Sequence, residues 1–164
     1  MIFRLIALSI SFVHLQSAFA CEHGSLQELE TTWKAFRKVS IERKVDEIAK
    51  FYRFPLKMKS PLEGSMPLTV TKEIFKKNYD TLFIEAVPHQ PNEIYVELKT
   101  TRDDDVRSET RREFLNDGCS HVGYAHIFSY EFRWRKDRGW YIDSIFTADY
   151  DALEIEFNSG GIKK

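Results

Sequence analysis

The chain has 164 residues, a formal net charge of −1, and aromatic side chains at 14% of its positions. This near-neutral balance argues against nucleic acid as the main partner, because nucleic-acid-binding domains carry a strong basic excess. The length fits a short leader followed by one domain, whose hydrophobic core is large enough to form without a metal.

Residues 1–20 have the features of a secretory signal peptide. Arg4 supplies the positive charge, residues 5–13 form an apolar run, and the last three residues have the small-x-small pattern of a cleavage site. Two polar residues interrupt the run before it reaches the roughly 20 apolar residues that a membrane-spanning helix needs. We therefore expect cleavage after Ala20 and a mature domain of residues 21–164 that is periplasmic or secreted.

Both cysteines, Cys21 and Cys119, lie in the predicted mature domain. An even number of cysteines in an oxidising compartment favours a disulfide between them. In the chain-entropy model, closing a loop of about 100 residues stabilises the folded state by about 4 to 5 kcal/mol. Two alternatives stay open: lipidation of Cys21, which directly follows the cleavage site, and a zinc site that includes His121.

The mature part begins with a helical pattern. Ser25 and Glu28 form a capping box, which predicts a helix N-terminus. Apolar side chains then recur at helical spacing as far as Ser40, and a shorter helix with Val45 and Ile48 on one side follows.

The middle of the chain is predicted to contain strands and a third helix. Residues 54–59 alternate with period two, and Pro55 among them indicates an edge or first-residue position in a strand. Thr71 is a candidate cap for a helix that continues to Leu82. Residues 93–99 alternate again and predict a second strand.

The most polar stretch is residues 100–112. It contains three adjacent aspartates and four arginines, without the alternating ligand spacing of a calcium-binding loop. This composition predicts a solvated turn between strands.

Residues 124–134 alternate between two sets of side chains and predict one long strand. A three-residue loop ending at Gly139 then leads into a second strand over residues 140–146. In the register that matches the apolar faces, Arg133 lies opposite Asp143 and both tryptophans of the hairpin face the helices. The predicted aromatic face consists of Tyr124, His126, Phe128, Tyr130, Phe132 and Trp134.

His126 is the one imidazole on that face. It is either a structural histidine of the core or a hydrogen-bonding group at the floor of a pocket. The ligand-binding candidates are Tyr124, His126, Phe128 and Tyr130. The sequence predicts no catalytic residue, no metal and no cofactor, because no nucleophile–base or metal-ligand spacing is present.

The order of these elements resembles the nuclear transport factor 2-like superfamily, as an exported bacterial member. The matching residues are Trp33 and Phe36 in the first helix, Ile48 and Tyr52 in the second, and the Gly-Trp-x-Ile-x-x-Ile pattern of Gly139–Ile145. The resemblance implies an α+β fold in which N-terminal helices pack on a strongly curved antiparallel sheet, forming a cone with a pocket at its open end. Enzymes of that superfamily typically place an acidic residue or a histidine just after the second helix or within the cone, and residues 51–57 contain no carboxylate.

We therefore expect an exported, non-enzymatic binding domain. Its ligand would be a small apolar molecule in the cone or a protein on the sheet surface, and a homodimer through the sheet is a further expectation. We expect no nucleic acid partner and no membrane association after cleavage. The alternatives are a small polyketide cyclase-like or isomerase-like enzyme that uses His126, and a periplasmic immunity or inhibitor protein.

Overall fold

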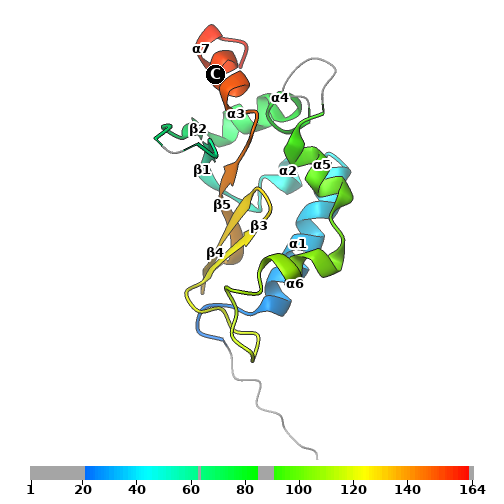
Figure 1. The fold of residues 1–164 in the computed structure, drawn as a ribbon. Helices are drawn as coiled ribbons and strands as arrows, with labels where there is room; N and C mark the ends of the chain where they lie inside the picture. The colour runs from blue at the N-terminus through cyan, green and yellow to red at the C-terminus, as the bar shows by residue number, and fades with distance from the viewer. Residues whose placement is uncertain (1–20, 63, 85–90, 163–164) are drawn as a thin grey trace, which may run out of the picture.

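The computed structural model of the chain describes residues 21–62, 64–84 and 91–162, and the predicted signal peptide lies outside these ranges. The fold is mixed α+β, with helices α1, α5 and α6 on one side of a five-stranded sheet (Figure 1). None of the helices in the described ranges is long and apolar enough to cross a membrane.

Seven helices and five strands make up the described ranges. The helices are α1 (Leu26–Ile41), α2 (Val45–Ile48), α3 (Lys72–Lys77), α4 (Tyr79–Phe83), α5 (Glu93–Thr100), α6 (Asp103–Glu109) and α7 (Tyr150–Ser159). The strands are β1 (Tyr52–Lys59), β2 (Leu68–Val70), β3 (Tyr124–Ile127), β4 (Tyr130–Arg135) and β5 (Gly139–Phe146). The strand order is β2-β1-β5-β4-β3, in which β1 and β5 are parallel and the other neighbours antiparallel.

The prediction of the first helix is confirmed in detail. The Ser25 hydroxyl accepts a hydrogen bond from the Glu28 backbone N–H, and the Glu28 carboxylate accepts one from the Ser25 N–H. Trp33 and Phe36 are buried on one face of α1, as their spacing predicts. The predicted cap at Thr71 is also confirmed, since its hydroxyl accepts a hydrogen bond from the third residue of α3.

The strand predicted over residues 93–99 is wrong, because this segment forms helix α5. The Asn92 side chain caps the helix by accepting a hydrogen bond from the Ile94 N–H at 2.9 Å. Ile94 and Leu98 are buried four residues apart, whereas Val96 is 42% exposed. In a segment with apolar residues at every second position, some of them are also four residues apart, as on one face of a helix. Here the cap at Asn92 and the burial of Ile94 and Leu98 favour the helix.

The solvated turn predicted over residues 100–112 is also wrong, because helix α6 occupies most of it. Val106 and Thr110 are buried four residues apart against the rest of the fold. The Asp105 carboxylate accepts a hydrogen bond from the Arg102 N–H at 2.7 Å, which satisfies one free donor at the helix start. A single buried valine gives too little periodicity for a polar segment to be recognised as a helix.

The long strand predicted over residues 124–134 is interrupted. Phe128 and Ser129 form a two-residue turn between β3 and β4, and Phe128 has a positive φ of 50°. The two strands pair as an antiparallel hairpin in which Ile127 lies opposite Tyr130. The segment is therefore two short strands that reverse direction.

The predicted register of the β4–β5 hairpin is wrong. Arg133 lies opposite Tyr141 and not opposite Asp143, because the loop spans residues 136–138 and Arg135 pairs with Gly139. A bulge follows farther along, between Glu131 and Phe132. Trp134 and Trp140 lie directly opposite each other on the same side of the sheet as the buried core residues, as predicted.

Pro55 lies in an interior strand, so its predicted edge or first-residue position is wrong. Strand β1 has β2 on one side and β5 on the other. The pairing of β1 with β5 is interrupted between Tyr52 and Lys57, which spans Pro55. An irregular stretch of this kind accommodates a residue that has no N–H to donate.

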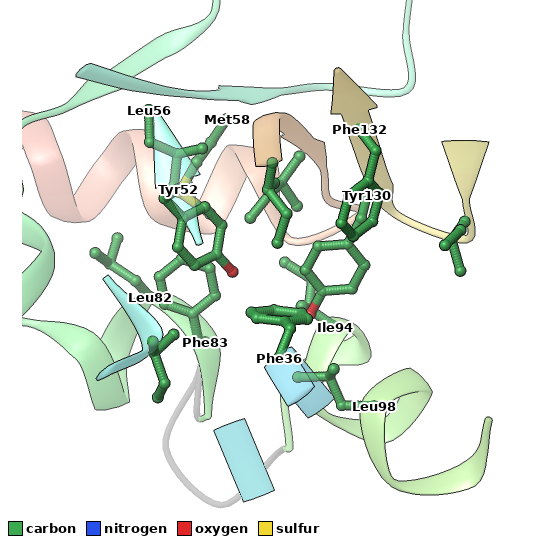
Figure 2. Close-up of a cluster of buried hydrophobic side chains, with 14 of the residues drawn as sticks. Phe36, Tyr52, Leu56, Met58, Leu82, Phe83, Ile94, Leu98, Tyr130 and Phe132 are labelled. Carbon is green, nitrogen blue, oxygen red and sulfur yellow. The ribbon is translucent and has the colours of Figure 1, made fainter. Parts of the chain in front are cut away.

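The interior between the sheet and the helices is filled with aromatic rings. Figure 2 shows Phe36 between Tyr52 and Tyr130, with ring centroids 5.7 and 5.2 Å from its own. Trp33 lies edge-on to Tyr130 at 5.5 Å. Further rings continue the cluster: Phe51, Phe54, Phe75, Tyr79, Phe83 and Phe132. These rings are tilted or edge-on to one another, at separations at which aromatic pairs attract.

A disulfide joins Cys21 to Cys119, as predicted, with the two Cα atoms 5.3 Å apart. It ties the segment before α1 to the loop before β3. Backbone hydrogen bonds support the same junction, because the Ser120 N–H donates to the Gly24 carbonyl at 2.9 Å. The pairing leaves no free cysteine among the described residues.

Candidate functional site

The four residues predicted to line one pocket lie in three different places. Tyr130 is fully buried in the aromatic core. Phe128 is at the tip of the β3–β4 hairpin. Tyr124 and His126 alternate with the buried Ala125 and Ile127, so they lie on the side of the sheet opposite the core. The prediction of a common face is wrong because the two-residue turn exchanges the faces of the residues before and after it.

We call the side of the sheet turned away from α1, α5 and α6 the outer face (Figure 1). Cross-strand pairing places Tyr124, Arg133 and Tyr141 in one row across it. The outer face comprises Arg53, Lys57, Lys59, Thr69, Tyr124, His126, Glu131, Arg133, Arg135, Tyr141, Asp143, Ser144 and Phe146.

Glu131 is the centre of a polar network on the outer face. The Lys59 ammonium lies 2.6 Å from its Oε2 atom, and the Ser144 hydroxyl donates to the same oxygen. The Tyr124 hydroxyl donates to Oε1 at 3.3 Å. The Glu131 side chain is only 13% exposed, so these donors replace the water that a buried carboxylate loses.

Tyr124 is held as a neutral donor in this network. Partial burial raises the pKa of its hydroxyl, and the negative charge of Glu131 together with the hydrogen bond to it raises that pKa further. The Arg133 guanidinium lies over the Tyr124 ring at 4.6 Å. The ring thus has an anion at its hydroxyl and a cation on its face.

His126 lies directly opposite Glu131 across the hairpin. An acidic residue therefore shares the face of His126. Its ring meets the Phe146 ring edge-on at 5.9 Å, and its Nε2 atom is buried without a hydrogen-bond partner among the described groups. The Glu131 oxygens accept from Lys59, Ser144 and Tyr124, and no hydrogen bond joins this carboxylate to His126 among the described groups.

Cations lie over aromatic rings at several points of the outer face. Besides Arg133, the Lys59 ammonium is 5.0 Å from the Phe146 ring centroid, and the Arg138 guanidinium is 4.7 Å from that of Tyr141. Such contacts are worth about 0.5–1 kcal/mol each at exposed sites. Their effect here is to place positive charge at defined positions on the surface of the sheet.

Phe128, at the tip of the β3–β4 hairpin, borders a cavity of about 280 Å³ between α5, α6 and this tip. Within it, the Glu97 carboxylate accepts hydrogen bonds from the Ser129 N–H at 3.1 Å and from its hydroxyl at 2.9 Å. Burial raises the Glu97 pKa; the Ser129 hydrogen bonds oppose this shift, and the charges of Glu93 and Glu109 add to it. The lining residues are Glu97, Thr100, Thr101, Asp105, Ser108, Glu109 and Phe128.

In the described ranges, no three His, Cys, Asp or Glu side chains converge in an arrangement that could hold a metal ion. Comparisons of the chain with protein-family models, with curated proteins and with solved structures find no match.

Sequence reasoning missed Glu131, Lys59 and Ser144 as partners in one network. The sequence does contain a signal for the turn. Before it, the apolar residues Ala125 and Ile127 occupy odd-numbered positions, whereas after it the core residues, from Tyr130 on, occupy even-numbered positions. That change of parity indicates a break at residues 128–129.

Proposed function

We propose that this chain is an exported, non-enzymatic binding protein that recognises a partner protein through its outer face. The observation that carries the proposal is the contrast between the two sides of the sheet. The inner side is filled by rings packed on rings, whereas the outer face presents cations above half-buried rings. Exposed surfaces of this composition are typical of interaction sites, where aromatic residues and arginine are enriched.

The disulfide supports export. Disulfides persist in oxidising compartments and are rare in reducing ones, so Cys21–Cys119 fits the predicted signal peptide. Export and cleavage after Ala20 remain parts of this proposal.

The packed interior favours a surface partner over a small apolar ligand. A ligand inside the cone would have to displace rings that already contact one another, such as Phe36 and Tyr130 at 5.2 Å. Both of these side chains are completely buried. Displacing core rings costs several kcal/mol, which a small ligand would have to repay.

The enzyme alternative finds less support at His126. A catalytic imidazole needs a group that orients it, and the carboxylate opposite His126 already accepts three other donors. A periplasmic immunity or inhibitor protein is one form that the proposed protein-binding function could take.

We include in the proposal a distant relationship to the nuclear transport factor 2-like superfamily. It is supported by the α1–α2 pair that precedes β1, and by β5 lying beside β1 in the middle of the sheet. Proteins of one fold serve many functions, so the functional proposal rests on the outer face and not on this relationship.

Site-directed photo-crosslinking in the native host tests the proposal. A photoreactive benzoyl-phenylalanine replaces Thr69 or Arg135 on the outer face, and Lys38 or Lys99 on the helical side as matched controls. We expect a discrete adduct with another protein from the two outer-face positions and none from the controls. Equal adducts from both sides, or none from the outer face, would contradict the proposal.

A further inference from the structure

The outer face has cations in excess, and its carboxylates are already paired with some of them. The pairs on and beside it are Arg53 with Asp143 at 3.2 Å, Lys59 with Glu131 at 2.6 Å, and Arg135 with Asp137 at 3.0 Å. Within the described ranges, Lys57, Arg133 and Arg138 have no carboxylate partner. The positive charge that remains is therefore available to an outside anion.

Two of these cations are held in place before any partner arrives. Arg133 lies 4.6 Å from the Tyr124 ring centroid and Arg138 lies 4.7 Å from that of Tyr141. Arg138 also donates to the Tyr52 carbonyl at 2.7 Å. A guanidinium that is already oriented loses less conformational freedom on binding a carboxylate, and its planar fork suits a bidentate contact.

Apolar surface lies beside this charge. Tyr124 and Phe146 are both half-buried, and each has a cation over its ring. A partner that alternates carboxylates with apolar side chains would therefore meet both features. A polyanion whose charges sit on a sulfated or phosphorylated backbone would use only the cations.

The charge of the whole chain also favours a short acidic peptide over a long polyanion. Its net charge is −1, and the cavity on the helical side carries the carboxylates of Glu97, Asp105 and Glu109. Long polyanions are attracted by a large overall positive field, which this molecule lacks. The attraction is confined to one face and suits a short acidic segment.

We propose that the outer face binds an acidic peptide segment of the partner protein that also carries apolar side chains. Carboxylates of the segment pair with Lys57 and Arg133, and its apolar side chains cover the rings of Tyr124 and Phe146. The inference rests on the proposed function and adds the chemistry of the partner.

Binding of a glutamate–tyrosine random copolymer to the purified exported protein tests this inference. Isothermal titration with the wild-type protein is compared with the double variant Lys57→Glu, Arg133→Glu. We expect saturable binding to the wild type and an affinity loss of roughly tenfold or more in the double variant, because each reversal replaces an attraction with a repulsion. The control variant Lys38→Glu, Lys99→Glu changes the net charge equally on the helical side, and should stay within about twofold of the wild type.

Several results would overturn the inference. Equal losses in the two double variants would show unspecific charge attraction, and equal binding of poly-glutamate would remove the role of the rings. Tighter binding of heparin than of the copolymer would indicate a polyanion partner. A wild-type dimer in sedimentation that the Lys57→Glu, Arg133→Glu variant dissociates would show that a second copy occupies the face. Unchanged melting of each variant serves as the folding control.

The two proposals fail in different ways. If the copolymer does not bind, but the crosslink from Thr69 persists in the Lys57→Glu, Arg133→Glu background, the acidic segment is wrong and the outer-face function stands. If the wild-type protein gives no outer-face adduct at all, the proposed function fails, whatever the copolymer does.

Discussion

The two sides of the sheet both carry aromatic rings, but the rings have different neighbours. On the inner side, Phe36 contacts Tyr52 and Tyr130, and every member of this trio is buried. On the outer face, the rings of Tyr124 and Phe146 lie beneath charged groups.

This difference separates stability from recognition. A ring packed on other rings stabilises the fold through burial and dispersion. A half-buried ring under a cation contributes little to folding, but it fixes the position of a charge. Substitutions on the two sides of the sheet should therefore affect different measurements, and the following predictions test that separation.

The largest effect is expected in the core. Trp33→Ala should lower the free energy of unfolding by about 3–5 kcal/mol, because it leaves a cavity among buried rings. Arg133→Ala, its outer-face counterpart, should cost less than about 1 kcal/mol. Urea denaturation measures both changes. A Trp33→Ala cost close to that of Arg133→Ala would indicate a loosely filled interior and would reopen the question of a pocket there.

Loss of the disulfide should have the next largest effect. The Cys21→Ser, Cys119→Ser variant should lose about 2–5 kcal/mol of unfolding free energy, because the cross-link closes a loop of 98 residues in the unfolded chain. Thiol labelling of the denatured, unreduced wild type should find no free sulfhydryl. Two labelled cysteines would refute the pairing.

Loss of Glu131, the polar centre of the outer face, should lower the unfolding free energy less than loss of Trp33 or of the disulfide. Glu131→Ala leaves Lys59 and Ser144 without their shared acceptor, and should cost about 1–3 kcal/mol. Asp143, which pairs with the exposed Arg53 and is less buried than Glu131, is the matched control, and Asp143→Ala should cost less than about 1 kcal/mol. Thermal melting compares the two. Equal costs would mean that the network around Glu131 contributes no more than a surface ion pair.

The smallest expected effect is the contribution of Glu97 to the pH dependence of the unfolding free energy. Its pKa is raised in the folded state by burial, so folding favours the protonated carboxyl. The stabilisation that results from this shift is complete at pH values below the ordinary carboxyl pKa of 4.5, and it is lost as the pH rises through the raised pKa. The unfolding free energy of the wild type relative to Glu97→Gln should therefore fall between acidic and neutral pH. Parallel pH profiles for the two proteins would contradict the raised pKa.

Local signals in the sequence predicted the parts of the fold that depend on local interactions. The capping box at Ser25 and the spacing of Trp33 and Phe36 define α1 without reference to the rest of the chain. The pattern of residues 93–99 does not by itself distinguish helix α5 from a strand, because Ile94 and Leu98 fit either period; the cap at Asn92 does.

The candidate site was harder to predict because it depends on pairing between distant segments. Lys59 reaches Glu131 only because β1 lies beside β5, and these strands are far apart in the chain. The face of His126 depends on a turn at Phe128, a residue that rarely adopts a positive φ. The pairing of β1 with β5 has no local sequence signal, and the turn is indicated only by the change in the spacing of apolar residues between Ile127 and Tyr130.

The two-residue turn at Phe128 and Ser129 has a consequence for how this chain can diverge. A change of one residue in the length of β3 would turn Tyr124 and His126 towards the core, and Ala125 and Ile127 towards solvent. Relatives that gain or lose residues on this strand should therefore do so in pairs. An odd change would be tolerated only if a compensating bulge arose in the same hairpin.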